Sequence, residues 1–162
     1  MAFTEFGRKS ALVIGIGNLY RSDDGVGPII AGRLGEMFQD QIDVCTGIKD
    51  GFSLIYLWQE YDHVYLIDAV SSGRTPGKVY RFDAVTKPPP KNLFTNYSTH
   101  SIDILETIAL AENLDSLPKR LIIYGVEGKD FSIGSGLSDE VLKAVCRVAD
   151  AIIKELDGHQ KY

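Results

Sequence analysis

Five stretches of the chain have the apolar and polar spacing of β-strands. Three of them are short and almost continuously apolar, as is typical of strands covered on both faces: Ser10–Gly15, His63–Ala69 and Arg120–Gly125. A fourth, Lys78–Phe82, alternates apolar with polar residues behind a Pro-Gly turn, which predicts an edge strand exposed on one face. The fifth is Ile42–Thr46.

Helical spacing recurs between these strands. Apolar residues separated by three and four positions predict helices over Val26–Phe38, Phe52–Tyr61, Ile102–Glu112 and Ser138–Leu156. Alternation of buried strands with helices predicts an α/β fold, a three-layer sandwich whose mostly parallel five-stranded sheet is flanked by helices on both faces. In such a sheet, ligands bind at the edge where the parallel strands end.

The third helix follows an irregular segment. Three consecutive prolines, residues 88–90, predict an extended loop that continues to about Tyr97. Ser98 and Thr99 are then the candidates for the cap at the start of the helix.

Composition narrows the class of protein. A chain of 162 residues, 44% of them hydrophobic, is expected to form one domain spanning residues 1–162. The net charge of -5, with the basic residues scattered along the chain, argues against nucleic acid or an anionic membrane as a partner.

The first apolar run has only about seven residues and lacks a signal-peptide layout, so a cytoplasmic protein is expected. The protein is also expected to be a monomer. Cys45 and Cys146 lack metal-ligand spacing and are predicted to be buried free thiols.

The densest group of chemically active residues is GIGNLYRSDDGVG, residues 15–27. A dinucleotide-binding loop would need glycine at position 20, which is Tyr20, and adjacent Asp23 and Asp24 would repel a pyrophosphate. Helix capping is one explanation for the acids, but two acids exceed what a cap requires. We assign Asp23 to capping or loop hydrogen bonding and Asp24 to a site for a cation or a hydrogen-bond donor.

Asp68 and His100 are the other candidates. Asp68 interrupts an apolar run at the end of a predicted buried strand, where an ionised carboxylate must be paired, hydrogen-bonded or metal-bound. His100 lies just before a predicted helix, where it is either a ligand or an exposed or capping residue. In a parallel sheet, Asp24 and Asp68 can converge, and with an imidazole they form a set suited to nickel, zinc, iron or manganese.

These motifs resemble the hydrogenase maturation endopeptidases of nickel-iron hydrogenases. The resemblance runs through GIGNLYRSDDGVG, LIDAV at 66–70, His100, GVE at 125–127 and GLSDEV at 136–141, and so covers essentially the whole chain. It implies a five-stranded sheet between helices and a metal-contacting set of Asp24, Asp68 and His100. The implied substrate is the precursor of a [NiFe]-hydrogenase large subunit, which loses a C-terminal extension after nickel has been inserted.

The chain departs from the family in one loop. The family has an acid and then a glycine-glycine-threonine-x-glycine loop after the second strand, where this chain has TGIKDG, residues 46–51. Gly47, Asp50 and Gly51 are therefore the candidates for a substrate-selecting loop.

The mechanism is left with two alternatives. Covalent catalysis lacks its motifs here, and the family is grouped with aspartic-type endopeptidases although the pepsin-like motif is absent. Either nickel carried by the precursor polarises the scissile carbonyl or a water while Asp24 or Asp68 acts as general base, or nickel only positions the peptide. Resident metal in the free enzyme is expected to be weakly bound or absent.

A non-catalytic, metal-sensing chaperone of the large subunit is the alternative function. A nucleotide-binding protein ranks behind both the protease and the chaperone.

Overall fold

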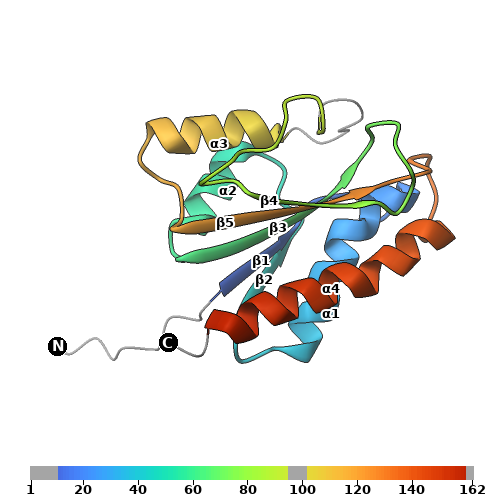
Figure 1. The fold of residues 1–162 in the computed structure, drawn as a ribbon, viewed down its shortest axis with the longest axis horizontal. Helices are drawn as coiled ribbons and strands as arrows, with labels where there is room; N and C mark the ends of the chain where they lie inside the picture. The colour runs from blue at the N-terminus through green and yellow to red at the C-terminus, as the bar shows by residue number, and fades with distance from the viewer. Residues whose placement is uncertain (1–10, 95–101, 160–162) are drawn as a thin grey trace.

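In the computed structural model, which describes residues 11–94 and 102–159, five strands form one sheet between two pairs of helices (Figure 1). The strands are β1 (Ala11–Gly15), β2 (Ile42–Thr46), β3 (His63–Val70), β4 (Val79–Asp83) and β5 (Arg120–Glu127). The helices are α1 (Val26–Met37), α2 (Gly51–Trp58), α3 (Ile104–Asn113) and α4 (Asp139–His159), and a 3-10 turn, η1 (Ser22–Gly25), precedes α1.

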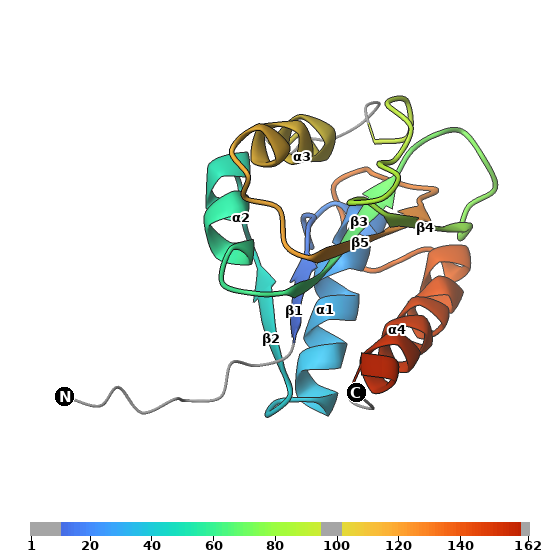
Figure 2. The same cartoon turned by 60° about the vertical axis from the view of Figure 1, so that its left-hand side comes forward.

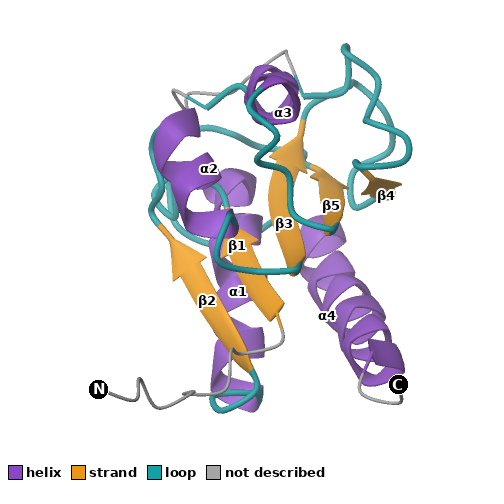
Figure 3. Cartoon of the chain, turned by 90° about the vertical axis from the view of Figure 1, so that its left-hand side faces the viewer, coloured by secondary structure: helices purple, strands orange, loops and turns teal. Residues whose placement is uncertain are grey.

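The strand order is β2-β1-β3-β5-β4, and every neighbouring pair is parallel except β4 with β5. The predicted mostly parallel five-stranded sheet is therefore confirmed, and β4 is the predicted edge strand. Figure 3 shows β1, β2, β3 and β5 pointing the same way. Their carboxyl ends meet at one edge, because Gly15 lies opposite both Thr46 and Ile67 and Val70 lies opposite Glu127.

Alternation along the central strands divides the core into two layers. Val13, Tyr65 and Ile122 face α1 and α4, whereas their neighbours Leu12 and Val64 face α2 and α3. The two helix pairs lie on opposite sides of the sheet in Figure 2. Strands β1, β3 and β5 are buried on both faces, which explains their nearly continuous apolar sequences.

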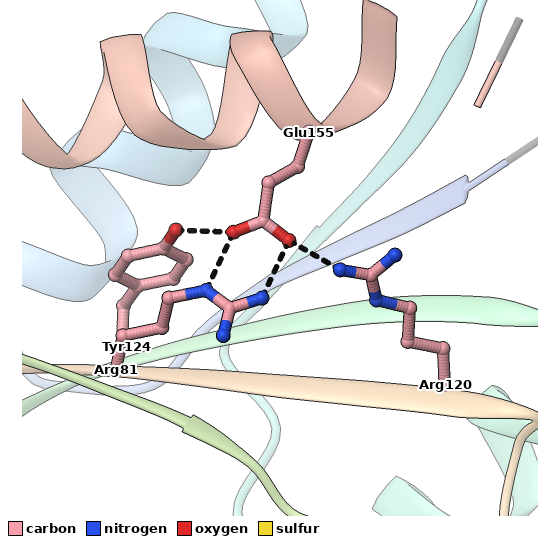
Figure 4. Close-up of polar contacts among 4 residues, drawn as sticks. All are labelled: Arg81, Arg120, Tyr124 and Glu155. Carbon is pink, nitrogen blue, oxygen red and sulfur yellow. Dashed lines mark hydrogen bonds and ion pairs between the residues drawn. The ribbon is translucent and has the colours of Figure 1, made fainter. Parts of the chain in front are cut away.

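A charged cluster ties α4 to the sheet near the start of β5 (Figure 4). The Glu155 carboxylate accepts hydrogen bonds from Arg81 Nε at 2.7 Å and Arg81 Nη2 at 2.9 Å. It also accepts from Arg120 Nη2 at 3.0 Å and from the hydroxyl of Tyr124. These bonds join the helix to both β4 and β5.

Two local expectations are corrected. Helix α3 begins at Ile104, because the Asp103 carboxylate accepts from the N–H groups of Leu105 and Glu106 and caps the helix. Ser98 and Thr99, the expected caps, lie outside the described residues. Both cysteines are free as predicted, but neither is buried: Cys45 on β2 is half-buried, and Cys146 is exposed because its position on α4 faces away from the core.

Within the described parts of the chain, no helix combines the length and apolar character needed to cross a membrane.

Candidate active site

The β1–α1 loop is held by close contacts between backbone segments. Gly17 has a φ of +145°, and a Cβ at this position would lie 1.9 Å from the carbonyl oxygen of Asp24. A Cβ on Gly27 would lie 2.3 Å from Ile16 O and 2.4 Å from Ile67 O. These two glycines let the Asp24 turn and the start of α1 approach the ends of β1 and β3. Backbone packing therefore accounts for both of these glycines.

Asp24 is buried in this loop, with 4% of its surface exposed. Its Oδ2 accepts a hydrogen bond from the backbone N–H of Asn18 at 3.0 Å. The residue that precedes α1 is Gly25, and no side chain caps either η1 or α1. Asp24 is thus held by the loop itself and is not a helix cap.

Asp68 lies near the end of β3 and is 7% exposed. Its Oδ1 accepts a hydrogen bond from the backbone N–H of Ala69 at 2.8 Å, and Gly125 is its register partner on β5. Since Ile16 N also donates to Ile67 O at 2.8 Å, the loop that carries Asp24 leaves β1 beside Asp68. The sheet therefore brings the two acids to the same edge, as parallel pairing of β1 with β3 requires.

His100, the third residue of the predicted metal-contacting set, lies outside the described residues. Over residues 11–94 and 102–159, no group of three or more histidine, cysteine, aspartate or glutamate side chains could hold a metal ion. The described part of the chain contributes two carboxylates to the predicted set.

Asp23 has a different role from its neighbour. It is fully buried, and its carboxylate accepts hydrogen bonds from the backbone N–H groups of Lys129, Asp130 and Ser138 at 2.7–2.9 Å. The hydroxyl of Ser138 donates a fourth bond at 2.9 Å. Of the two roles expected for this residue, the structure supports loop hydrogen bonding. Asp23 fixes the segment that connects β5 to α4.

The predicted substrate-selecting loop divides into two parts. Gly47, with a φ of +78°, lines a cavity of about 370 Å³ together with Gly17 and Asn18 of the β1–α1 loop. Asp50 instead caps α2 by accepting from Ser53 N at 2.8 Å, and a Cβ on Gly51 would lie 2.5 Å from Thr107 Oγ1. Of the three, only Gly47 lines this cavity.

Glu127 was not singled out as a site residue from the sequence. It ends β5, is 1% exposed, and accepts hydrogen bonds from Ser72 N and Ser72 Oγ, both at 2.7 Å, and from Tyr80 Oη at 3.2 Å. The signal was present, because Glu127 ends an apolar run as Asp68 does. Its carboxylate fixes the first part of the loop that follows β3.

Comparison with known proteins identifies the family. A model described as hydrogenase maturation protease matches residues 30–155. The chain belongs to the hydrogenase maturation protease family. Because this match begins after Gly27, it is independent of the GIGNLYRSDDGVG motif. The resemblance inferred from the sequence is thereby confirmed, and the chain is placed among endopeptidases, which hydrolyse peptide bonds.

Individual relatives agree with this assignment. The chain is 31% identical over 157 residues to the delta subunit of coenzyme F420 hydrogenase from Methanothermobacter thermautotrophicus, covering 90% of this chain and 93% of that one. An endopeptidase from Escherichia coli has a similar structure, with a TM-score of 0.79, 25% identity and 93% of each chain covered. The [NiFe] hydrogenase maturation protease HybD from Thermococcus kodakarensis has a TM-score of 0.70 at 25% identity, covering 91% of this chain and 99% of that one.

Proposed function

We propose that this hydrogenase maturation protease removes the C-terminal extension of a nickel-loaded [NiFe]-hydrogenase large-subunit precursor. The observation that carries the proposal is the position of two buried carboxylates, Asp24 and Asp68, at one edge of the sheet. Asn18, whose backbone N–H donates to Asp24, lines a cavity of about 370 Å³ at this edge. Such a cavity can admit a short extended segment of a partner chain.

The chemistry assigned to the two carboxylates is general acid–base catalysis. One carboxylate accepts a proton from a water molecule as the water oxygen bonds to the scissile carbonyl carbon. When the carbon–nitrogen bond breaks, the proton passes to the leaving amine, so that the carboxylate is regenerated. Burial strengthens the interaction of these groups with a charged transition state, because little water competes for them.

Nickel enters this scheme as cargo of the substrate. Carboxylates and imidazole are suitable ligands for a divalent metal, and a set of Asp24, Asp68 and His100 would leave coordination positions for the precursor's own ligands. The described part of the chain offers two carboxylates with no cysteine beside them. This set fits a site that leaves coordination positions open for a metal held by the substrate better than a closed site that retains its own metal. The proposal therefore assigns recognition of the metal to the moment at which the precursor docks.

The decisive experiment incubates the purified protein with nickel-loaded precursor and determines the masses of the products. The expected result is a shortened large subunit together with the free extension peptide. A stable complex with no change in either mass would favour the non-catalytic chaperone and reject proteolysis.

The origin of the metal requirement is tested separately. Treating the protease alone with a chelator, and then removing the chelator, is expected to leave cleavage unchanged, whereas nickel-free precursor is expected to remain uncut. Efficient cleavage of nickel-free precursor by chelator-treated protease would contradict metal recognition. The two carboxylates would then be assigned to a metal-independent mechanism.

A further inference from the structure

A second cavity, of about 560 Å³, opens at the same edge of the sheet. Its walls come from three connections: Arg21 follows β1, Ser71 and Arg74 follow β3, and Glu127, Lys129 and Phe131 end or follow β5. The second of these connections starts only three residues after Asp68. The cavity is separate from the one lined by Gly47, and neither Asp24 nor Asp68 is among the residues that line either cavity.

Positive charge is concentrated in this cavity although the whole chain has a net charge of -5. Three of its lining residues are basic, Arg21, Arg74 and Lys129, and one is acidic, Glu127. The carboxylate oxygens of Glu127 already accept hydrogen bonds from Ser72 and Tyr80. Lys129 Nζ pairs with Glu140 at 2.8 Å, whereas neither guanidinium pairs with an acid of the described chain.

The side chain of Arg21 has an unused donor inside the protein. Its Nε is buried and has no hydrogen-bond partner in the structure. A buried donor that lacks a partner is rare and calls for an explanation, such as a ligand that completes the site. Arg21 is half-buried and lines the cavity, so an anion bound there would lie beside the side chain that carries this donor.

Backbone hydrogen bonds hold Arg21 at the cavity wall. Ser22 N donates to Gly134 O and Gly134 N donates to Tyr20 O, both at 3.0 Å, so the residues that flank Arg21 are bonded to the segment after β5. The hydroxyl of Ser22 adds a bond to Ser132 O at 3.0 Å. Asp23 fixes the same segment at Lys129 and Asp130. The backbone from which the Arg21 side chain extends is therefore fixed by the fold before any ligand arrives.

We infer that this cavity binds a carboxylate of the substrate peptide through Arg21 and Arg74. The inference rests on the proposed function, because the substrate of an endopeptidase is a peptide and its anionic groups are the C-terminal carboxylate and acidic side chains. A guanidinium presents two parallel N–H donors that match the two oxygens of a carboxylate. The pocket would then hold one anionic point of the peptide while the scissile bond lies beside Asp24 and Asp68.

Binding is tested without cleavage, by following the Arg Nε–H signals in NMR spectra during titration with three short peptides. N-acetyl-Ala-Ala with a free C-terminus offers a terminal carboxylate, N-acetyl-Asp-Ala amide offers a side-chain carboxylate, and N-acetyl-Ala-Ala amide offers neither. The Arg21 signal is expected to shift saturably with at least one of the two acids and not with the neutral amide. The acid that gives the shift identifies the source of the carboxylate. Absence of a saturable shift with both acids, or the same shift with all three peptides, would overturn the inference.

Kinetics on the nickel-loaded precursor provide the second test. Arg74→Gln is expected to raise KM about tenfold and to leave kcat nearly unchanged, because it removes a binding contact distant from the reacting bond. Arg33→Gln, which removes the same charge from an exposed position on α1, is the matched control and should change neither constant. Equal KM values for the wild type and Arg74→Gln would overturn the inference and leave proteolysis intact. If the wild type does not cut the precursor, the proposed function fails, and the NMR titration still decides whether the carboxylate site exists.

Discussion

Asp23 and Ser138 are joined by two hydrogen bonds, in which the backbone N–H of Ser138 donates to Oδ1 at 2.7 Å and its hydroxyl donates to Oδ2 at 2.9 Å. The two residues are separated by 115 positions in the sequence. Their contact fixes the β1–α1 loop to the segment that precedes α4. The acid beside Asp24 therefore organises the edge of the sheet at which substrate is proposed to bind.

Asp23→Asn is expected to destabilise the protein by roughly 1.5–3 kcal/mol. Asparagine keeps one acceptor oxygen but places an NH₂ group against a backbone N–H that the carboxylate now satisfies. This cost exceeds the loss of about 1 kcal/mol that is typical of a helix cap. Urea denaturation would measure it. Asp50→Asn is the matched control, because asparagine caps a helix as well as aspartate does, and its free energy of unfolding should stay close to that of the wild type.

Asp24→Asn and Asp68→Asn are each expected to lower the cleavage rate by at least about 100-fold, as is usual when a general acid or base is lost. His100→Ala is expected to reduce cleavage severely as the third member of the predicted set. Asp40→Asn, an exposed change between α1 and β2, should cleave at the wild-type rate. Rates are measured by mass spectrometry on nickel-loaded precursor, with folding checked by circular dichroism. A wild-type rate in any of the three variants would remove that residue from the site. Folded Asp23→Asn should retain more activity than Asp24→Asn.

Gly27→Ala is expected to destabilise the protein by roughly 1–3 kcal/mol and to impair cleavage, because the new Cβ would overlap the carbonyl oxygens of Ile16 and Ile67. Relief of this overlap must move the start of α1 away from the ends of β1 and β3. Gly32→Ala, on the same helix, meets no atom within 4 Å and should stabilise the protein by about 0.5–1 kcal/mol. Equal unfolding midpoints for these two variants would show that the close packing at Gly27 is unimportant.

Acid is expected to weaken the attachment of α4 through Glu155. Burial alone would raise the pKa of this carboxyl, but hydrogen bonds from Arg81 and Tyr124 and the charges of Arg81 and Arg120 outweigh it, so the pKa lies below its ordinary value of 4.5. A carboxyl whose pKa is lowered by folding contributes stability that is fully present above the unfolded value. This contribution is lost as the pH falls from 4.5 through the lower value of the folded protein.

Glu155→Gln is accordingly expected to cost about 1–3 kcal/mol at pH 7 and progressively less below pH 4.5. Denaturation curves of the wild type and the variant across this pH range would measure the difference. Glu36→Gln, at an exposed position on α1, should have the same free energy of unfolding as the wild type at every pH. A difference between the wild type and Glu155→Gln that did not depend on pH would mean that the charge of Glu155 does not anchor the helix.

The local spacing of residues was sufficient to predict most of the architecture. Continuous apolar runs and helical spacing depend only on neighbours in the chain, so the buried strand around Val13 and the helix that carries Ile30 were predictable. The acid that ends the apolar run of β3 identified Asp68 in the same way, and parallel pairing predicted that it would lie near Asp24. The start of α3 was missed, because Asp103 competed with other capping residues that follow equally well from the sequence.

The sequence by itself determined the elements, the mostly parallel sheet and the edge at which its acids meet, because each follows from spacing along a few residues. Only the tertiary structure decided that Asp23 holds the segment before α4, that Glu127 fixes the loop after β3, and that Arg21 lines a cavity with Arg74. These relationships join residues separated by about 50 to more than 100 positions. Their partners are set by strand order, register and the packing of loops, none of which is encoded in the spacing of nearby residues.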